Sequence, residues 1–399
     1  MFGRNSAYVL IVTVLFLLGI GMVMLFSVSA YAHDAHGDIY YFLRRQSLWL
    51  GFGLIACFCA TLLDYHVWRA MAWPLLCGSV ILLALCFVPG IGSRINGSWR
   101  WVRLGPISFQ PSELAKLASV IAVAHWFTTN ERVAGKLVPG FLLPVLIVAV
   151  PTLLILREED MGTALLVGAV AVVLMFIAGS NFIYMAILAI MLTGGVYLTA
   201  RHNTNRAGRM TAFLDLEKYK ESFGLQQWEA LKAFAAGGTQ GLGLGDSREK
   251  MRYLPYAHTD FIFPIIGEEL GLRATLPIVA SFLVIALCSY AISTRAKDRF
   301  GALLAFGLGL MIALQAAVNI GVTTALLPNK GMPLPFISAG GSNLCVCLLF
   351  VGILLNIHRQ GGRITADLKT DVAPLDKARA LVRKRTPSRR IKRRPVDSV

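Results

Sequence analysis

Long apolar blocks separated by polar segments run through most of this 399-residue chain. A block of about 17–25 apolar residues is long enough to cross a bilayer as a helix. The blocks that reach this length are residues 8–30, 47–63, 70–89, 111–128, 139–156, 160–178, 181–199, 261–291, 300–326 and 334–357. We therefore expect an all-α polytopic integral membrane protein with about ten transmembrane helices.

The polar segments between these blocks predict how the chain lies across the membrane. An even number of spans puts both termini on one side, together with the basic loops around Arg69 and Arg295. The positive-inside rule assigns this side to the cytoplasm. A large loop, residues 200–260, then lies outside between the seventh and eighth spans. We expect a transmembrane domain over residues 1–357 and a disordered basic cytoplasmic tail over residues 358–399.

Composition agrees with this class, since 56% of the residues are hydrophobic and only 15% are charged. The net charge of +16 is concentrated after His358, where 13 Lys and Arg face 4 Asp. Such a tail is expected to attract anionic membrane lipids, and we expect no nucleic-acid partner. All seven cysteines lie in apolar blocks, so we expect neither a disulfide framework nor a zinc site.

The segment from Tyr253 to Gly271 is the first place to look for chemistry. In it a polar run leads into an apolar block that carries Asp260, Glu268 and Glu269. Acids beside hydrocarbon are costly and usually face a cavity, a partner or a substrate. Helical geometry places Asp260 and Glu268 roughly 80° apart around the axis, so both could serve one cavity. The alternative is that Asp260 merely caps the start of a helix.

A second polar segment, residues 97–116, combines Trp101 with basic residues and leads into a predicted helix. Glu113 and Lys116 stand one helical turn apart, which favours a structural ion pair. Arg100 and Lys116 could also hold an anionic group such as a pyrophosphate. Both interpretations stay open at this point.

The Gly/Pro-rich segment 327–343 interrupts the last two apolar blocks. Irregular backbone at membrane depth is tolerated where it lines a cavity. On that interpretation the segment is a second wall of the site. The alternative is an ordinary short external turn.

Three further patterns have simple structural explanations. Asp160, the last of three adjacent acids, is expected to cap a helix, and a divalent-cation site there is only weakly indicated. Residues 226–236 have helical periodicity, and the glycine run 237–246 lacks the Gly-Lys-Ser/Thr ending of a nucleotide loop. We expect this run to pack closely at the membrane surface. Arg45, in an aromatic and basic stretch, is most simply an interfacial anchor.

The motifs together resemble the SEDS family of bacterial cell-wall polymerases, which includes FtsW and RodA. The resemblance covers residues 8–357 and is carried by the segments 110–116, 254–263, 267–271 and 335–342. The segment Asn329-Lys330-Gly331 looks more like the FtsW branch than like RodA. The sequence departs from the family pattern at Tyr256, Glu159, Pro264 and Ala339.

The resemblance implies a peptidoglycan glycosyltransferase that polymerises lipid II by inverting transfer. Asp260 would then be the general base for the acceptor hydroxyl. The leaving pyrophosphate needs positive charge, which a bound Mg²⁺ or Mn²⁺ or the basic side chains Arg45, Arg100, Lys116 and Lys330 would supply. Glu268 would orient a cation or raise the pKa of Asp260 through its like charge. Trp101 and Ser338 complete the expected substrate contacts.

The resemblance also implies lipid II, a class B penicillin-binding protein and other divisome proteins as partners. It implies the bacterial inner membrane as the location, at the division septum. Three alternatives remain: a lipid II transporter whose path is lined by Glu113, Lys116 and Glu268, a RodA-type elongation polymerase, and a scaffold that recruits division proteins. We recognise none of the inverted repeats that are common in secondary transporters.

Overall fold

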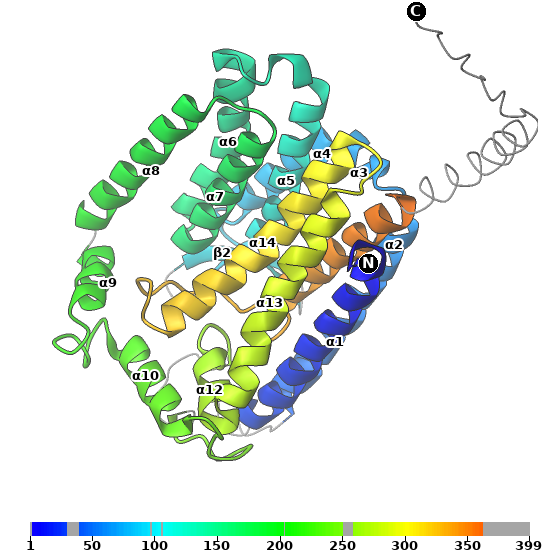
Figure 1. Cartoon of the computed structure of the whole chain (residues 1–399). Helices are drawn as coiled ribbons and strands as arrows, with labels where there is room; N and C mark the ends of the chain where they lie inside the picture. Colours follow the sequence, from blue (N-terminus) through cyan, green and yellow to red (C-terminus); the bar gives the residue numbers. More distant parts are fainter. Residues whose placement is uncertain are drawn as a thin grey trace, which may run out of the picture.

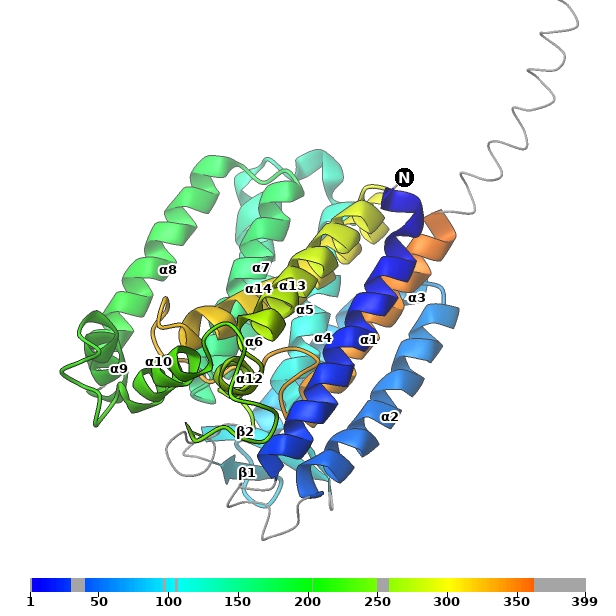
Figure 2. The ribbon, with the colours of Figure 1, turned by 60° about the horizontal axis from the view of Figure 1, so that its bottom comes forward.

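The apolar blocks of the sequence become the helices of a bundle, and a small sheet lies at one end of it (Figures 1 and 2). The computed structural model describes residues 2–29, 40–95, 98–104, 107–202, 204–249 and 258–361. The predicted tail beyond residue 361 and residues 254–257 of the family motif lie outside these ranges.

The described helices are α1 (Phe2–Ser29), α2 (Tyr41–Leu62), α3 (His66–Ala70), α4 (Ala72–Leu85), α5 (Pro111–Thr129), η2 (Glu131–Val133), η3 (Val138–Leu142), α6 (Leu143–Arg157), α7 (Met161–Ile177), α8 (Phe182–His202), α9 (Thr204–Leu214), α10 (Leu225–Gly237), α12 (Ile262–Leu270), α13 (Leu272–Ser293), α14 (Arg299–Thr323) and a last helix, Gly341–Gly361.

Six of the described helices are long and apolar enough to cross a membrane: Asn5–Ser29, Tyr41–Leu62, Val138–Arg157, Leu272–Ser293, Arg299–Thr323 and Gly341–Gly361. Shorter apolar helices accompany them at Ala72–Leu85, Met161–Ile177 and Phe182–Met191. The chain is therefore a multi-pass, all-α membrane protein, as predicted. The number of ten spans stays a prediction.

The predicted span 261–291 is present but begins later than predicted, since the apolar helix runs over Leu272–Ser293. The backbone breaks at Gly271, whose φ of 69° ends α12 and lets α13 start in a new direction. A Cβ at this position would stand 2.5 Å from the amide nitrogen of Gly241, so only glycine fits without a shift. Likewise the last helix begins at Gly341 and not at residue 334, because the segment before it is irregular.

The sequence did not predict the small antiparallel sheet. Its strands are β1 (Gly92–Ile95), β2 (Ser98–Leu104) and β3 (Ile107–Phe109), in the order β1-β2-β3. Val102 of β2 pairs with Gly92 on one side and Phe109 on the other. The sheet closes the same end of the bundle as α12, which Figure 2 shows.

The loops divide into two sets at opposite ends of the bundle (Figure 2). Ser6 Oγ lies 3.3 Å from His358 Nδ1, so the start of the first described helix lies beside the end of the last one. At that end Arg299 pairs with Glu131 and donates to the Ala178 carbonyl at 2.6 Å. This confirms that the predicted basic loops share one side with both described chain ends. The assignment of that side to the cytoplasm stays a prediction.

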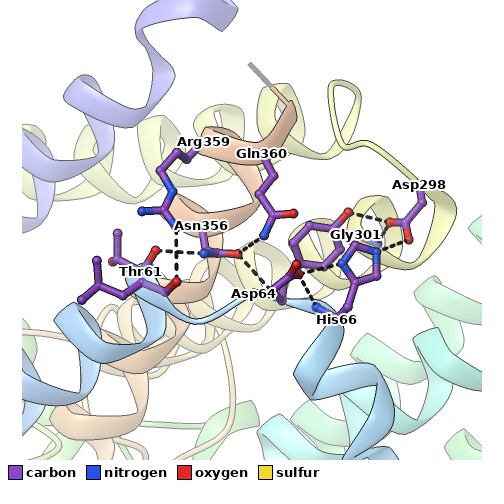
Figure 3. Close-up of polar contacts among 10 residues, drawn as sticks. Thr61, Asp64, His66, Asp298, Gly301, Asn356, Arg359 and Gln360 are labelled. Atoms are coloured by element: carbon purple, nitrogen blue, oxygen red, sulfur yellow. Dashed lines mark hydrogen bonds and ion pairs between the residues drawn. The ribbon is translucent and has the colours of Figure 1, made fainter. Parts of the chain in front are cut away.

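A polar cluster anchors helix α14 at this end (Figure 3). The Asp298 carboxylate caps the helix by accepting from the Gly301 N–H at 2.8 Å, and it also accepts from the Tyr65 hydroxyl at 2.9 Å. The His66 ring lies between two carboxylates, 2.7 Å from Asp64 Oδ1 and 3.0 Å from Asp298 Oδ2. The cluster therefore ties α14 to the turn between α2 and α3.

Candidate functional site

Asp260 stands at the opposite end of the bundle, in the turn that precedes α12. Helix α12 has Phe261 as its N-cap, and no side chain caps its first turn. The alternative that Asp260 merely caps this helix is therefore wrong. The turn is held from α14, because the Asn319 side-chain amide donates to the Asp260 carbonyl oxygen at 2.8 Å.

The Gly/Pro-rich segment before the last helix lies directly against this carboxylate. Most of its residues 332–338 are buried, which an ordinary external turn would not be. A Cβ built on Gly331 would stand 2.5 Å from Asp260 Oδ2. The Ala339 N–H donates to the His258 carbonyl at 2.9 Å, two residues before the acid. The structure thus supports the interpretation of this segment as a second wall of the site.

The surroundings of Asp260 favour a proton acceptor that works near neutral pH. Burial raises the pKa of Asp260 to about 6, against 3.8 for an unperturbed Asp. The positive charges of Arg100 and Arg209 oppose this rise, and the negative charge of Asp160 adds to it. A general base is most effective when its pKa lies near the working pH.

An apolar cavity of about 300 Å³ lies beside the site, between α7, α9, α14 and the segment after α14. Its charged lining residues are Arg209 and Lys330, and the Lys330 Nζ lies 3.0 Å from the sulfur of Met161. Lys330 directly precedes Gly331, and the charge of Arg209 acts on Asp260. The charged end of the cavity therefore adjoins the carboxylate.

Lys116 lies inside the bundle and is only 2% exposed. Its Nζ is 2.7 Å from the Glu113 carboxylate and 2.8 Å from Gln315 Oε1. The Asn343 amide donates to Glu113 at 3.0 Å. The predicted ion pair is thus confirmed, and it joins α5 to α14 and to the last helix. A contact between Lys116 and substrate stays a prediction.

The sheet and α2 carry three more of the predicted substrate contacts. Arg100 and Trp101 are half-buried on β2, and the charge of Arg100 acts on Asp260. Arg45 is exposed on α2 and donates to Ser108 Oγ on β3 at 3.1 Å. Arg100 is thus brought into the site, whereas Arg45 links α2 to the edge of the sheet.

Glu268 is buried and points at the loop that follows α10. Its carboxylate accepts from the Ser247 hydroxyl and from the Arg248 N–H, the latter at 2.9 Å. The like charge that acts on Asp260 belongs to Asp160 rather than to Glu268. In this arrangement Glu268 fixes the loop, and its predicted role towards substrate remains untested.

The glycine run packs tightly against α12, a contact that the sequence did not predict, and its packing at the membrane surface stays a prediction. A Cβ on Gly237 would stand 2.0 Å from the Gly267 carbonyl oxygen. The Leu242 N–H donates to the Glu268 carbonyl at 2.9 Å. Helix α10, which precedes the run, confirms the helix predicted for residues 226–236.

Ser338 closes a turn within the second wall. Its Oγ accepts from the Leu334 N–H at 2.8 Å, and its carbonyl accepts from the Gln46 amide at 3.1 Å. Both contacts are internal to the protein, so substrate contact by Ser338 stays a prediction.

The acidic turn before α7 stabilises the start of that helix. Asp160 caps α7 by accepting from the Thr163 N–H at 3.0 Å, as predicted, and also accepts from the Gln110 amide at 3.1 Å. Burial raises the pKa of the neighbouring Glu158 to about 8. Across the described ranges, no group of three His, Cys, Asp or Glu side chains could hold a metal ion. A bound Mg²⁺ or Mn²⁺ stays a prediction, because a cation held by one or two carboxylates together with substrate phosphates needs no such group.

Sequence reasoning missed three residues of this site. Gln315 and Asn319 stand four apart in the apolar block 300–326, and polar residues inside a span are a recognised sign of function. Arg209 had no comparable signal, because it comes from a polar loop about fifty residues before Asp260.

A comparison with protein families matches residues 8–362 to the profile FTSW_RODA_SPOVE, described as "Cell cycle protein". A relative from Geobacter sp. (strain M18), named "Probable peptidoglycan glycosyltransferase FtsW", is 40% identical over 341 residues, which is 85% of this chain and 93% of the relative. A protein of the same name from Legionella pneumophila subsp. pneumophila is 36% identical over 86% of this chain and 88% of its own.

Solved structures share the fold. One, described as "Structural coordination of polymerization and crosslinking by a peptidoglycan synthase complex", has a TM-score of 0.72 at 28% identity and covers 88% of this chain and 97% of the other. The Thermus thermophilus rod shape determining protein RodA has a TM-score of 0.65 at 28% identity, over 88% of this chain and 95% of its own.

Proposed function

The chain belongs to the FTSW_RODA_SPOVE family of cell cycle proteins, and on this premise we propose that it is a peptidoglycan glycosyltransferase that polymerises lipid II during cell division. Relatives named as such glycosyltransferases support the activity. The observation that carries the proposal is the position of Asp260, a carboxylate with a pKa of about 6 beside the charged end of an apolar cavity.

Each part of lipid II has a matching surface at this site. Its polyprenyl chain is apolar and suits the cavity between α7, α9 and α14. Its pyrophosphate suits the cavity's charged end, where Arg209 and Lys330 lie, with Arg100 as a third cation. The sugar then lies over Asp260, at the end of the bundle closed by the sheet.

The reaction follows from this placement. The acceptor hydroxyl loses its proton to the Asp260 carboxylate while its oxygen bonds to the anomeric carbon of the donor. The bond between that carbon and the pyrophosphate oxygen breaks, and polyprenyl pyrophosphate leaves with the electron pair. Arg100, Arg209 and Lys330 stabilise the charge that develops on the leaving group. General-base catalysis of this kind contributes roughly 10²–10⁴-fold.

The partners and location follow from the family. A structural neighbour is part of a peptidoglycan synthase complex, which supports a class B penicillin-binding protein as the partner that cross-links the new strand. Other divisome proteins complete the assembly. The protein lies in the bacterial inner membrane at the septum, with both termini in the cytoplasm and Asp260 outside.

Polymerisation of purified lipid II by the whole chain tests this function, with and without the partner transpeptidase and with and without Mg²⁺ or Mn²⁺. The wild type and Asp246→Asn should make glycan strands, and Asp260→Asn should make none. Asp246 is an exposed acid of the loop after α10, so the control makes the same chemical change away from the site. If no protein makes strands while all move lipid II across vesicle membranes, the protein is a transporter.

A further inference from the structure

Two amide side chains on α14 hold the second wall of the site. Gln315 and Asn319 are four residues apart, so they lie on one face of the helix, and they are 2% and 1% exposed. Gln315 Nε2 donates to the Pro333 carbonyl at 2.9 Å, and Asn319 Nδ2 donates to the Met332 carbonyl at 2.6 Å. Consecutive carbonyls of the irregular segment are therefore fixed to consecutive turns of α14.

Asn319 has a second contact that Gln315 lacks. The same Nδ2 donates to the carbonyl of Asp260 at 2.8 Å. One amide group thus joins the turn that carries the acid to the segment that carries Lys330 and Gly331. Gly331 lies against the Asp260 carboxylate, so a small shift of either segment changes the surroundings of that carboxylate.

Helix α14 is a firm support for this amide. It runs for 25 residues, and its first turn is capped by Asp298 in the polar cluster at the other end of the bundle. Gln315 is also fixed from α5, because its Oε1 accepts from the buried Lys116. The two amides therefore have little freedom to follow a moving loop.

We propose that Asn319 is a positioning residue, which aligns the Asp260 carboxylate with the Lys330–Gly331 segment and so with the pyrophosphate of the donor. This inference rests on the proposed function, in which Asp260 is the base. Asn319 touches neither substrate nor reacting atoms. It acts through the backbone of the base and of the cationic wall.

Gln227 on α10 provides a matched control. Its Nε2 also donates to two carbonyls, those of Val322 and Leu327, each at 2.8 Å. It is 1% exposed, and within the described ranges the side-chain oxygens of Gln227 and Asn319 both lack a hydrogen-bond partner. Replacement of either amide by leucine removes the same kind of buried contact, but only one of the two touches the Asp260 turn.

The test is the pH dependence of lipid II polymerisation by the wild type, Asn319→Leu and Gln227→Leu. Among the described residues, the charged or titratable groups near Asp260 are Arg100 on β2, Asp160 before α7, Arg209 on α9, Lys330 in the wall and His258 in the same turn. In Asn319→Leu we expect kcat to fall about 100-fold, the cost of a shift of about 1 Å at a reacting group. We also expect the acid limb of the profile to move to lower pH, because water reaches a carboxylate whose pKa burial had raised.

Gln227→Leu should lower the thermal stability but keep the acid limb of the wild type. If Asn319→Leu keeps the wild-type kcat, or loses rate with an unmoved acid limb, the residue is only structural and the inference is wrong. Asp260→Asn distinguishes a failure of this inference from a failure of the proposed function. If the Asp260→Asn protein polymerises lipid II, Asp260 is not the base and the proposed function itself is wrong.

Gly331→Ala is a second test of whether the wall is fixed against Asp260, for the case in which Asn319→Leu does not fold. The added methyl would stand 2.5 Å from Asp260 Oδ2, and no buried hydrogen bond is lost. If Asn319 fixes the wall, the wall cannot retreat, so the carboxylate must move and both kcat and the acid limb change. A Gly331→Ala protein with the wild-type rate and profile would show that the wall yields, which overturns the inference.

Discussion

The ammonium of Lys116 lies 2.7 Å from the carboxylate of Glu113, and both side chains are 2% exposed. An ion pair so deep in the bundle has lost its hydration, and removal of one partner leaves the other charge buried alone. We expect Lys116→Met to destabilise the fold by about 3–5 kcal/mol. The double variant Lys116→Met/Glu113→Gln, which leaves no charge, should recover part of that loss in thermal unfolding. Equal instability of the single and double variants would contradict this account.

Arg100 and Asp160 act on Asp260 with opposite signs, which gives a paired prediction. Arg100 lowers the pKa of Asp260, so Arg100→Gln should move the acid limb of the polymerisation profile to higher pH. Asp160 raises that pKa, so Asp160→Asn should move the limb to lower pH. Asparagine keeps the cap of α7, so the second variant should fold. Shifts of the same sign in both variants would exclude direct charge effects on Asp260.

The contact between the glycine run and α12 has no room for a side chain. A Cβ on Gly237 would stand 2.0 Å from the Gly267 carbonyl, and backbone cannot move aside as a side chain can. Gly237→Ala should cost about 1–3 kcal/mol, the usual range for overpacking. Gly168→Ala in α7 is the control, because nothing lies within 4 Å of the added atom. Unfolding temperatures in one detergent should fall only for the first variant.

Asp298 is expected to contribute more to the free energy of unfolding than a surface ion pair at the same end of the bundle. Its carboxylate caps α14 and binds Tyr65 and His66, so Asp298→Ala should cost about 1–2 kcal/mol or more. Glu131 pairs with Arg299 but is 60% exposed on its side chain, so Glu131→Ala should cost less than about 1 kcal/mol. A larger loss of unfolding temperature in Glu131→Ala would contradict this ranking.

The main helices were predictable because apolar blocks of sufficient length have few other stable forms in a membrane. The break at Gly271 was not predictable, because glycine is common inside membrane helices and only the folded chain shows its positive φ and its close approach to Thr239 and Gly241. The sheet at residues 92–109 was missed because β1 and β3 are only four and three residues long, and because the arginines and tryptophans of β2 were interpreted as parts of a polar loop.

The same contrast holds for the site. Asp260 could be identified from its place at a membrane boundary. Lys330 was a candidate only through the family resemblance. For three other residues near the site, the direction of the side chain depends on tertiary contacts. Glu268 points into a loop, Lys116 into an ion pair, and Arg209 reaches the cavity from a distant helix. Spacing along the chain carries no information about these directions.

The pH dependence of lipid II polymerisation by the wild type, measured beside Asp260→Asn, tests the central claim most directly. The base works only when deprotonated, and its pKa is raised to about 6, so the wild-type rate should fall roughly tenfold per pH unit below about pH 6. Asp260→Asn should have no measurable rate at any pH. Strands made by Asp260→Asn at the wild-type rate, or a wild-type rate that does not change as the pH falls through 6, would contradict the claim that Asp260 is the base.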